Sequence, residues 1–141
     1  MKPIAPLSIV LAALSLTGCV SDTPDTTTVT GTIATSDYYT DKDSGDPACY
    51  AYDRSLAQGQ GVILTDTDGQ VLGQGRLGAG SDIISNSPEI PSVCAFAFTI
   101  PDIPTTLTAY NIALQSRPEQ AVLLTGADLR ADNWTITLTF N

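Results

Sequence analysis

Histidine is absent from this chain of 141 residues. Its absence removes the commonest general base, the Ser-His-Asp and Cys-His catalytic arrangements, and the commonest zinc ligand. Basic residues are also scarce, because six Lys and Arg stand against 15 Asp and Glu, for a formal net charge of −9. Phosphate binding needs a basic surface, so we expect no nucleic-acid partner.

Long hydrophobic runs are missing as well, apart from one short run near the N-terminus. This run, Ile4–Leu16, is shorter than the roughly 20 residues that a membrane-spanning helix requires. Lys2 precedes it and Leu16-Thr17-Gly18-Cys19 closes it, an order typical of a secretory signal. The Leu-x-Gly-Cys ending resembles the lipobox of bacterial lipoproteins. That resemblance implies that Cys19 receives a diacylglyceryl group and becomes the first residue after cleavage.

The lipobox divides the chain into three expected parts: a signal peptide (1–18), a lipidated tether (19–28) and one folded domain (29–141). Two acyl chains hold a protein stably on a membrane, whereas one holds it only reversibly. Cleavage would remove Lys2 and take the formal net charge from −9 to −10. An anionic membrane surface repels such a domain, so we expect the lipid alone to attach it, on the extracytoplasmic side of the cell envelope.

Cysteine is limited to three residues, and lipidation of Cys19 leaves two of them. Outside the cytoplasm a remaining pair usually forms a disulfide. The sequence therefore predicts a disulfide between Cys49 and Cys94, which would leave no thiolate to act as a nucleophile or a metal ligand.

The dominant hydrophobic period is two, which is typical of half-buried strands. Apolar residues alternate with small or polar ones over Val29–Ile33, Cys94–Ile100, Tyr110–Leu114 and Trp134–Phe140, and an Asp-Gly turn signal lies at Asp66–Gly69. Helix is expected only at 125–131, where Thr125 can cap the first turn. These patterns predict an all-β fold, an antiparallel Greek-key β-sandwich of about seven strands.

Part of the domain resembles transthyretin-like and carboxypeptidase-regulatory-like domains. The hairpin Val62–Leu72 is similar to their V-x-L-x-D-x-x-G-x-V motif, and Phe96–Pro104 followed by Tyr110–Leu114 is similar to their F-x-F segment and the strand after it. The resemblance implies a seven-stranded Greek-key sandwich that serves as an accessory or adhesive module without catalytic residues. Ser81–Ser92 departs from the family pattern, which leaves the strand count there open.

Four aspartates form the first candidate site: Asp37, Asp41, Asp43 and Asp46. Calcium is bound by six to eight oxygen ligands, so four carboxylates within a short loop could hold it. The segment is not an EF-hand loop, because Gly45 replaces a ligand and Lys42 opposes a cation. The alternative is a solvated acidic loop. We expect no cofactor other than this candidate calcium ion.

Four tyrosines surround that loop and form the second candidate site: Tyr38, Tyr39, Tyr50 and Tyr52. Tyrosine offers a large rigid contact area with a polar tip, which suits protein binding or stacking on a sugar. The alternative is that Tyr50 and Tyr52 pack on the edge of the sandwich.

These observations favour a lipid-anchored, non-catalytic binding or accessory module on the cell surface, with a protein or a glycan as partner. A calcium-stabilised structural or adhesive module is the alternative. A hydrolase that uses two carboxylates is the third hypothesis, and we expect no enzyme, because nothing in the sequence pairs two carboxylates across a cleft.

Overall fold

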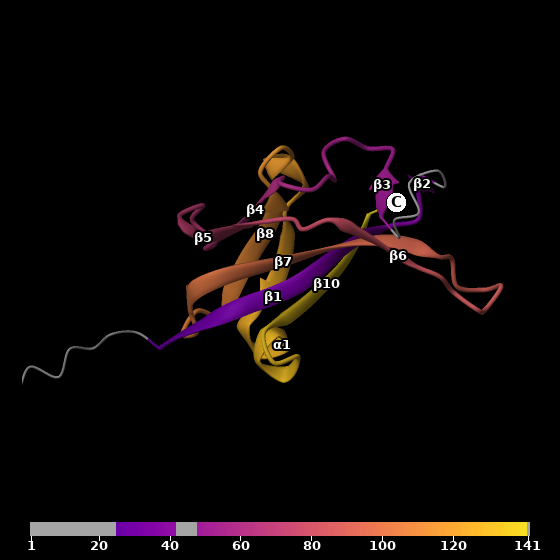
Figure 1. Cartoon of the computed structure of the whole chain (residues 1–141). Coiled ribbons are helices and arrows are strands. Elements are labelled where there is room, and N and C mark those ends of the chain that lie inside the picture. Colours follow the sequence, from indigo (N-terminus) through magenta and orange to yellow (C-terminus); the bar gives the residue numbers. More distant parts are fainter. Residues whose placement is uncertain (1–24, 42–47, 141) are drawn as a thin grey trace, which may run out of the picture.

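The computed structural model of the protein describes residues 25–41 and 48–140. Within these two ranges the chain folds as a β-sandwich with a single short α-helix, which confirms the expected all-β class (Figure 1). The elements are β1 (Thr26–Thr35), β2 (Tyr38–Thr40), β3 (Cys49–Ala51), β4 (Gly61–Thr65), β5 (Val71–Arg76), β6 (Gly80–Ile83), β7 (Val93–Pro104), β8 (Ala109–Leu114), η1 (Pro118–Gln120), β9 (Val122–Thr125), α1 (Gly126–Ala131) and β10 (Thr135–Phe140). No helix in the described ranges is long and apolar enough to cross a membrane.

Two four-stranded sheets make up the sandwich, in the orders β10-β1-β7-β6 and β5-β4-β8-β9. A separate hairpin of β2 and β3 lies beside the end of the first sheet (Figure 1). Neighbouring strands are antiparallel except β1 and β10, which pair in parallel from Thr30 opposite Thr135 to Thr35 opposite Phe140. The first sheet is therefore mixed, because α1 carries the chain over from β9 in the other sheet and β10 then runs in the same direction as β1.

The described residues contain ten strands, against the seven or so that we expected. One reason is the β2–β3 hairpin, which belongs to neither main sheet. Another is that the chain passes from one sheet to the other between β5 and β6. There the backbone N–H of Gly78 donates to the carbonyl of Ala97 at 2.8 Å, so that the chain stays beside β7 while it changes sheet.

The core lies between the two sheets and follows the period-two pattern. Alternate residues of β7 and β8 are buried, including Phe96, Phe98 and Tyr110. The Tyr110 hydroxyl donates to the carbonyl of Pro104 at 2.5 Å, which satisfies its polar end inside the core. Trp134, which immediately precedes β10, packs edge-on against the Tyr110 ring with centroids 5.8 Å apart.

Two strand boundaries differ most from those expected. Strand β1 begins at Thr26 rather than at Val29, because Thr26 and Thr27 pair with the last residues of β7. Strand β7 continues through Pro101, although proline is normally kept out of a central strand. A register shift between Thr27 and Val29 accommodates this irregular end of β7. The expected signal peptide and the tether as far as residue 24 lie outside the described residues.

The turn and helix signals were correct. Gly69 takes a φ of 84° in the β4–β5 hairpin, and the Asp66 carboxylate accepts from the backbone N–H groups of Asp68 and Gln70 at 2.9 and 2.8 Å. Both aspartate and glycine there serve the turn. The Thr125 hydroxyl accepts from the N–H of Asp128 at 3.1 Å and caps α1, as predicted.

Candidate functional site: a tyrosine-lined groove

The β2–β3 hairpin is fastened to the sandwich by the disulfide between Cys49 in β3 and Cys94 in β7, as the sequence predicted. Ala48, just before β3, also forms an isolated bridge with Ser81 in β6. The hairpin thus lies beside the end of the first sheet, next to β6 and β7 (Figure 1).

Three exposed tyrosines gather on the outer face of this hairpin. Tyr39 lies directly across from Tyr50, with ring centroids 5.5 Å apart and the rings 28° from parallel. The ring of Tyr52 lies 5.1 Å from that of Tyr39 on a diagonal. Their exposed fractions are 46%, 47% and 62% for Tyr39, Tyr50 and Tyr52. We call these three residues the tyrosine cluster; they are three of the four tyrosines that the sequence suggested.

Tyr38, the fourth tyrosine of the predicted binding surface, does not belong to this cluster. Successive side chains of a strand point to opposite faces, so Tyr38 faces inward when Tyr39 faces outward. The Tyr38 hydroxyl donates to the Asp82 carboxylate in β6 at 2.7 Å. This hydrogen bond, with a contribution from burial, raises the pKa of Tyr38 above 10.0. Tyr38 therefore holds the hairpin to the sheet.

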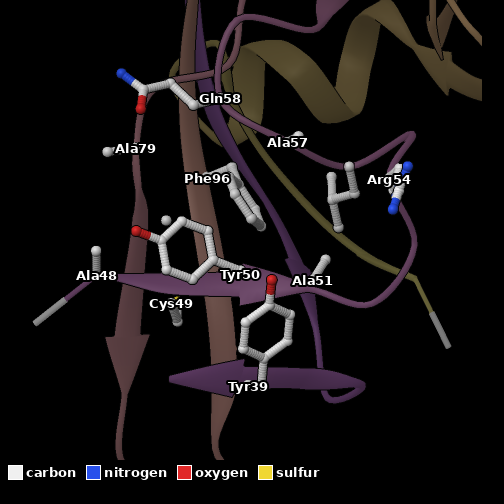
Figure 2. A pocket seen from close by; sticks show the side chains of 12 residues that line it. Tyr39, Ala48, Cys49, Tyr50, Ala51, Arg54, Ala57, Gln58, Ala79 and Phe96 are labelled. Atoms are coloured by element: carbon white, nitrogen blue, oxygen red, sulfur yellow. The ribbon is translucent and has the colours of Figure 1, made fainter. Parts of the chain in front are cut away.

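A groove of about 420 Å³ opens beside the tyrosine cluster (Figure 2). Tyr39 and Tyr50 form one side of it, with Phe96 behind them and Arg54 and Gln58 farther around the rim. The rest of the lining is small or aliphatic: Ala48, Cys49, Ala51, Leu56, Ala57, Ala79 and Gly80. Its volume lies within the range of about 300 to 1,000 Å³ that is usual for small-molecule sites. We call it the hairpin groove.

Gly80 lets the hairpin lie this close to the sheet. A Cβ atom at this position would overlap the carbonyl oxygen of Cys49 and lie only 2.7 Å from the sulfur of Cys94. The buried Phe96 pairs with Gly80 across β6 and β7, and its ring would lie 3.1 Å from the same Cβ atom. The groove therefore depends on a glycine in β6.

The charge in the groove is opposite to that of the protein as a whole. Among the described residues that line it, Arg54 is the sole charged side chain. The neighbouring carboxylate of Asp53 is turned to other partners: it accepts from the hydroxyl and the N–H of Ser55 and pairs with Arg117. The Ser55 hydrogen bonds, with a contribution from Arg117, lower the pKa of Asp53. Asp53 therefore remains charged and is balanced by Arg117 rather than by Arg54.

The structure covers the predicted calcium site only in part. Asp37 lies in the β1–β2 turn, where its N–H donates to the Thr35 hydroxyl at 3.1 Å. Asp41 follows β2, whereas Asp43 and Asp46 lie outside the described residues. Residues 25–41 and 48–140 contain no group of three acidic, histidine or cysteine side chains arranged to hold a metal ion. Binding of calcium by the four aspartates stays a prediction.

No family model, curated protein or solved structure matches the chain. The lipobox and the likeness to transthyretin-like domains therefore stay predictions from sequence. We therefore infer the function from the side chains that line the hairpin groove.

Sequence reasoning missed the other half of this groove. Arg54, Gln58, Gly80 and Phe96 come from three separate segments, and only Arg54 lies within two residues of a tyrosine in the sequence. The predicted disulfide could have indicated part of this neighbourhood, since Cys49 precedes Tyr50 and Cys94 lies two residues before Phe96. A disulfide between them brings Tyr50 and Phe96 into the same region.

Proposed function

We propose that the protein is a lipid-anchored, non-catalytic binding module of the cell envelope and that the hairpin groove is its binding site. The observation that carries this proposal is the tyrosine cluster, in which three exposed aromatic rings lie in contact beside a groove of about 420 Å³. Exposed aromatic side chains of this kind supply binding energy at little conformational cost. The ligand is a glycan or a protein partner.

The chemical character of the lining supports binding rather than catalysis. Its described side chains are aromatic, aliphatic and amide groups with one guanidinium. Such groups stack, donate hydrogen bonds and fix the orientation of a ligand. General acid–base hydrolysis of a glycoside would instead need two carboxyl groups facing one another.

The position of the groove relative to the expected anchor supports the same function. Strand β1 begins at Thr26 beside Pro104 and ends at Thr35 beside Cys94, next to the hairpin. Ten residues of strand span about 30 Å at roughly 3.3 Å per residue. The tether would therefore join the domain at the end opposite to the groove, so that the tyrosines are presented away from the anchoring membrane (Figure 1).

Photo-crosslinking in the native membrane tests this function. A photoreactive amino acid in place of Tyr52, the most exposed ring of the cluster, should give one reproducible adduct in cells. Adding Tyr39→Ala and Tyr50→Ala should abolish that adduct, because the ligand would lose the two rings that line the groove.

The matched control is Leu123→Ala, which removes an exposed apolar side chain from β9 in the other sheet. This variant should leave the adduct unchanged. An adduct that survives loss of Tyr39 and Tyr50 would show that the ligand binds elsewhere, and the proposed function of the groove would then be wrong.

A further inference from the structure

We propose that the ligand of the hairpin groove is an acidic saccharide, with a sugar ring stacked on Tyr50 and a carboxylate paired with Arg54. This inference rests on the proposed function and names the class of ligand for the same site. Its basis is the combination in one groove of accessible aromatic surface, a guanidinium and an amide.

The shape of the aromatic surface favours a flat ligand. Tyr39 and Tyr50 are 28° from parallel, so together they present a broad surface rather than a deep hole. The apolar face of a pyranose ring suits such a surface, since its C–H groups can lie on the rings while its hydroxyls stay in contact with water. Gln58 at the rim carries an amide that can donate to and accept from sugar hydroxyls.

Arg54 supplies the preference for an acid. A guanidinium pairs with a carboxylate through two parallel N–H···O bonds, which are stronger than bonds between neutral groups. The nearby carboxylate of Asp53 does not compete with the ligand for the Arg54 guanidinium, because it bonds to Ser55 and pairs with Arg117. No carboxylate occurs among the described lining residues, so Arg54 is the one charged side chain of that lining that an incoming carboxylate would meet.

The charge of the whole protein limits how acidic the ligand can be. With a formal net charge of −9, the domain repels a dense polyanion at long range. Arg54 acts at short range, where salt screens less than it does between distant charges. The arrangement therefore favours a saccharide with isolated carboxylates over a heavily sulfated or phosphorylated chain.

A matched pair of sugars tests the inference. Calorimetric titration of the full-length protein in detergent micelles would compare an oligosaccharide that carries one galacturonic acid with the methyl ester of that acid, which keeps the ring and loses the charge. The acid should bind about fivefold to tenfold more tightly than the ester, as a charge-assisted hydrogen bond at a half-open site permits. Raising the salt concentration should reduce this preference.

Single substitutions distinguish the preference for an acidic sugar from the binding of any sugar. Arg54→Gln should remove the preference and leave weak binding of both sugars, whereas Tyr50→Ala should abolish binding of both. Arg130→Gln is the matched control, because it removes the same charge from α1, where Arg130 donates to the carbonyl of Thr105. This control should keep the preference for the acid.

The two failures are distinguishable. Equal affinity for acid and ester, or a preference that survives Arg54→Gln, would overturn the acidic ligand while the groove remains a binding site. The protein could bind neither sugar and still give the adduct at position 52 in cells. That result would overturn the proposal of a saccharide ligand and favour a protein partner. An adduct that still forms after Tyr39 and Tyr50 are replaced by alanine would overturn the proposed function itself.

Discussion

Cys49 and Cys94 join the strand that carries Tyr50 to the strand that carries Phe96. Strand β3 is only three residues long and is paired with a β2 of the same length. A two-stranded hairpin of this size is not stable by itself in water. The disulfide, with the Tyr38–Asp82 hydrogen bond, therefore holds the tyrosine cluster against the sandwich.

Removing the disulfide should destabilise the domain and release the hairpin. The two cysteines are 45 residues apart, and closing a loop of that length is worth about 4 kcal/mol on the chain-entropy model. Chemical denaturation of the Cys49→Ala, Cys94→Ala variant should show a loss of free energy of unfolding of that order. An unchanged unfolding midpoint would show that the hairpin is held without the disulfide.

Gly80→Ala should lower the free energy of unfolding by about 1–3 kcal/mol, because the new methyl group overlaps the Cys49 carbonyl and crowds the Cys94 sulfur. Gly78→Ala is the matched control, since its Cβ would meet only the Ala97 carbonyl at 3.5 Å, an ordinary contact. Thermal unfolding of the two variants side by side measures the difference. Equal stability of the two would contradict the close approach of β3 and β6.

Alkaline pH should loosen the hairpin. The pKa of Tyr38 is raised above 10.0 in the folded protein, chiefly by its hydrogen bond to Asp82. Its contribution to stability is therefore present below pH 10 and is lost as the pH rises through the folded-state pKa. Carbon NMR of the tyrosine ring should follow this ionisation directly.

Asp82→Ala should move the pKa of Tyr38 back toward 10.0, because the hydrogen bond and the nearby negative charge are both removed. The pKa of Tyr110 is raised mainly by burial, so Tyr110 should titrate as before in this variant. A Tyr38 pKa that ignores the substitution would mean that Asp82 is not its partner in solution.

Cys19 should carry the lipid. The full chain expressed in a bacterium should incorporate labelled fatty acid and fractionate with membranes, as the lipobox predicts. Cys19→Ser should lose the label, because it has no sulfur to receive the diacylglyceryl group. Labelled Cys19→Ser protein would show that the anchor is attached at another residue.

Much of the fold could be predicted from local pattern. The alternation over Cys94–Ile100 and Tyr110–Leu114 placed the core residues of β7 and β8, and Asp66–Gly69 placed a hairpin turn. The parallel pairing of β1 with β10 could not be predicted, because it depends on which sheet each strand joins rather than on its own residues. The same is true of the change of sheet between β5 and β6.

The sequence indicated the tyrosines of the candidate site but not the other residues that line the groove. Clustering in the sequence found Tyr39, Tyr50 and Tyr52, yet it also included Tyr38, which strand alternation turns inward to Asp82. Arg54 is exposed and unremarkable in sequence. It gains a role only because the hairpin and the loop after it fold over β6, which is a long-range relationship.

The most direct test of the binding site needs no knowledge of the ligand. Hydroxyl-radical footprinting would compare the protein in its own membrane with the purified full-length protein, and would read the oxidation of each tyrosine. We expect Tyr39, Tyr50 and Tyr52 to be protected in the membrane preparation, while exposed Leu123 on β9 oxidises equally in both. Equal oxidation of the three tyrosines in both preparations would contradict a ligand in the hairpin groove.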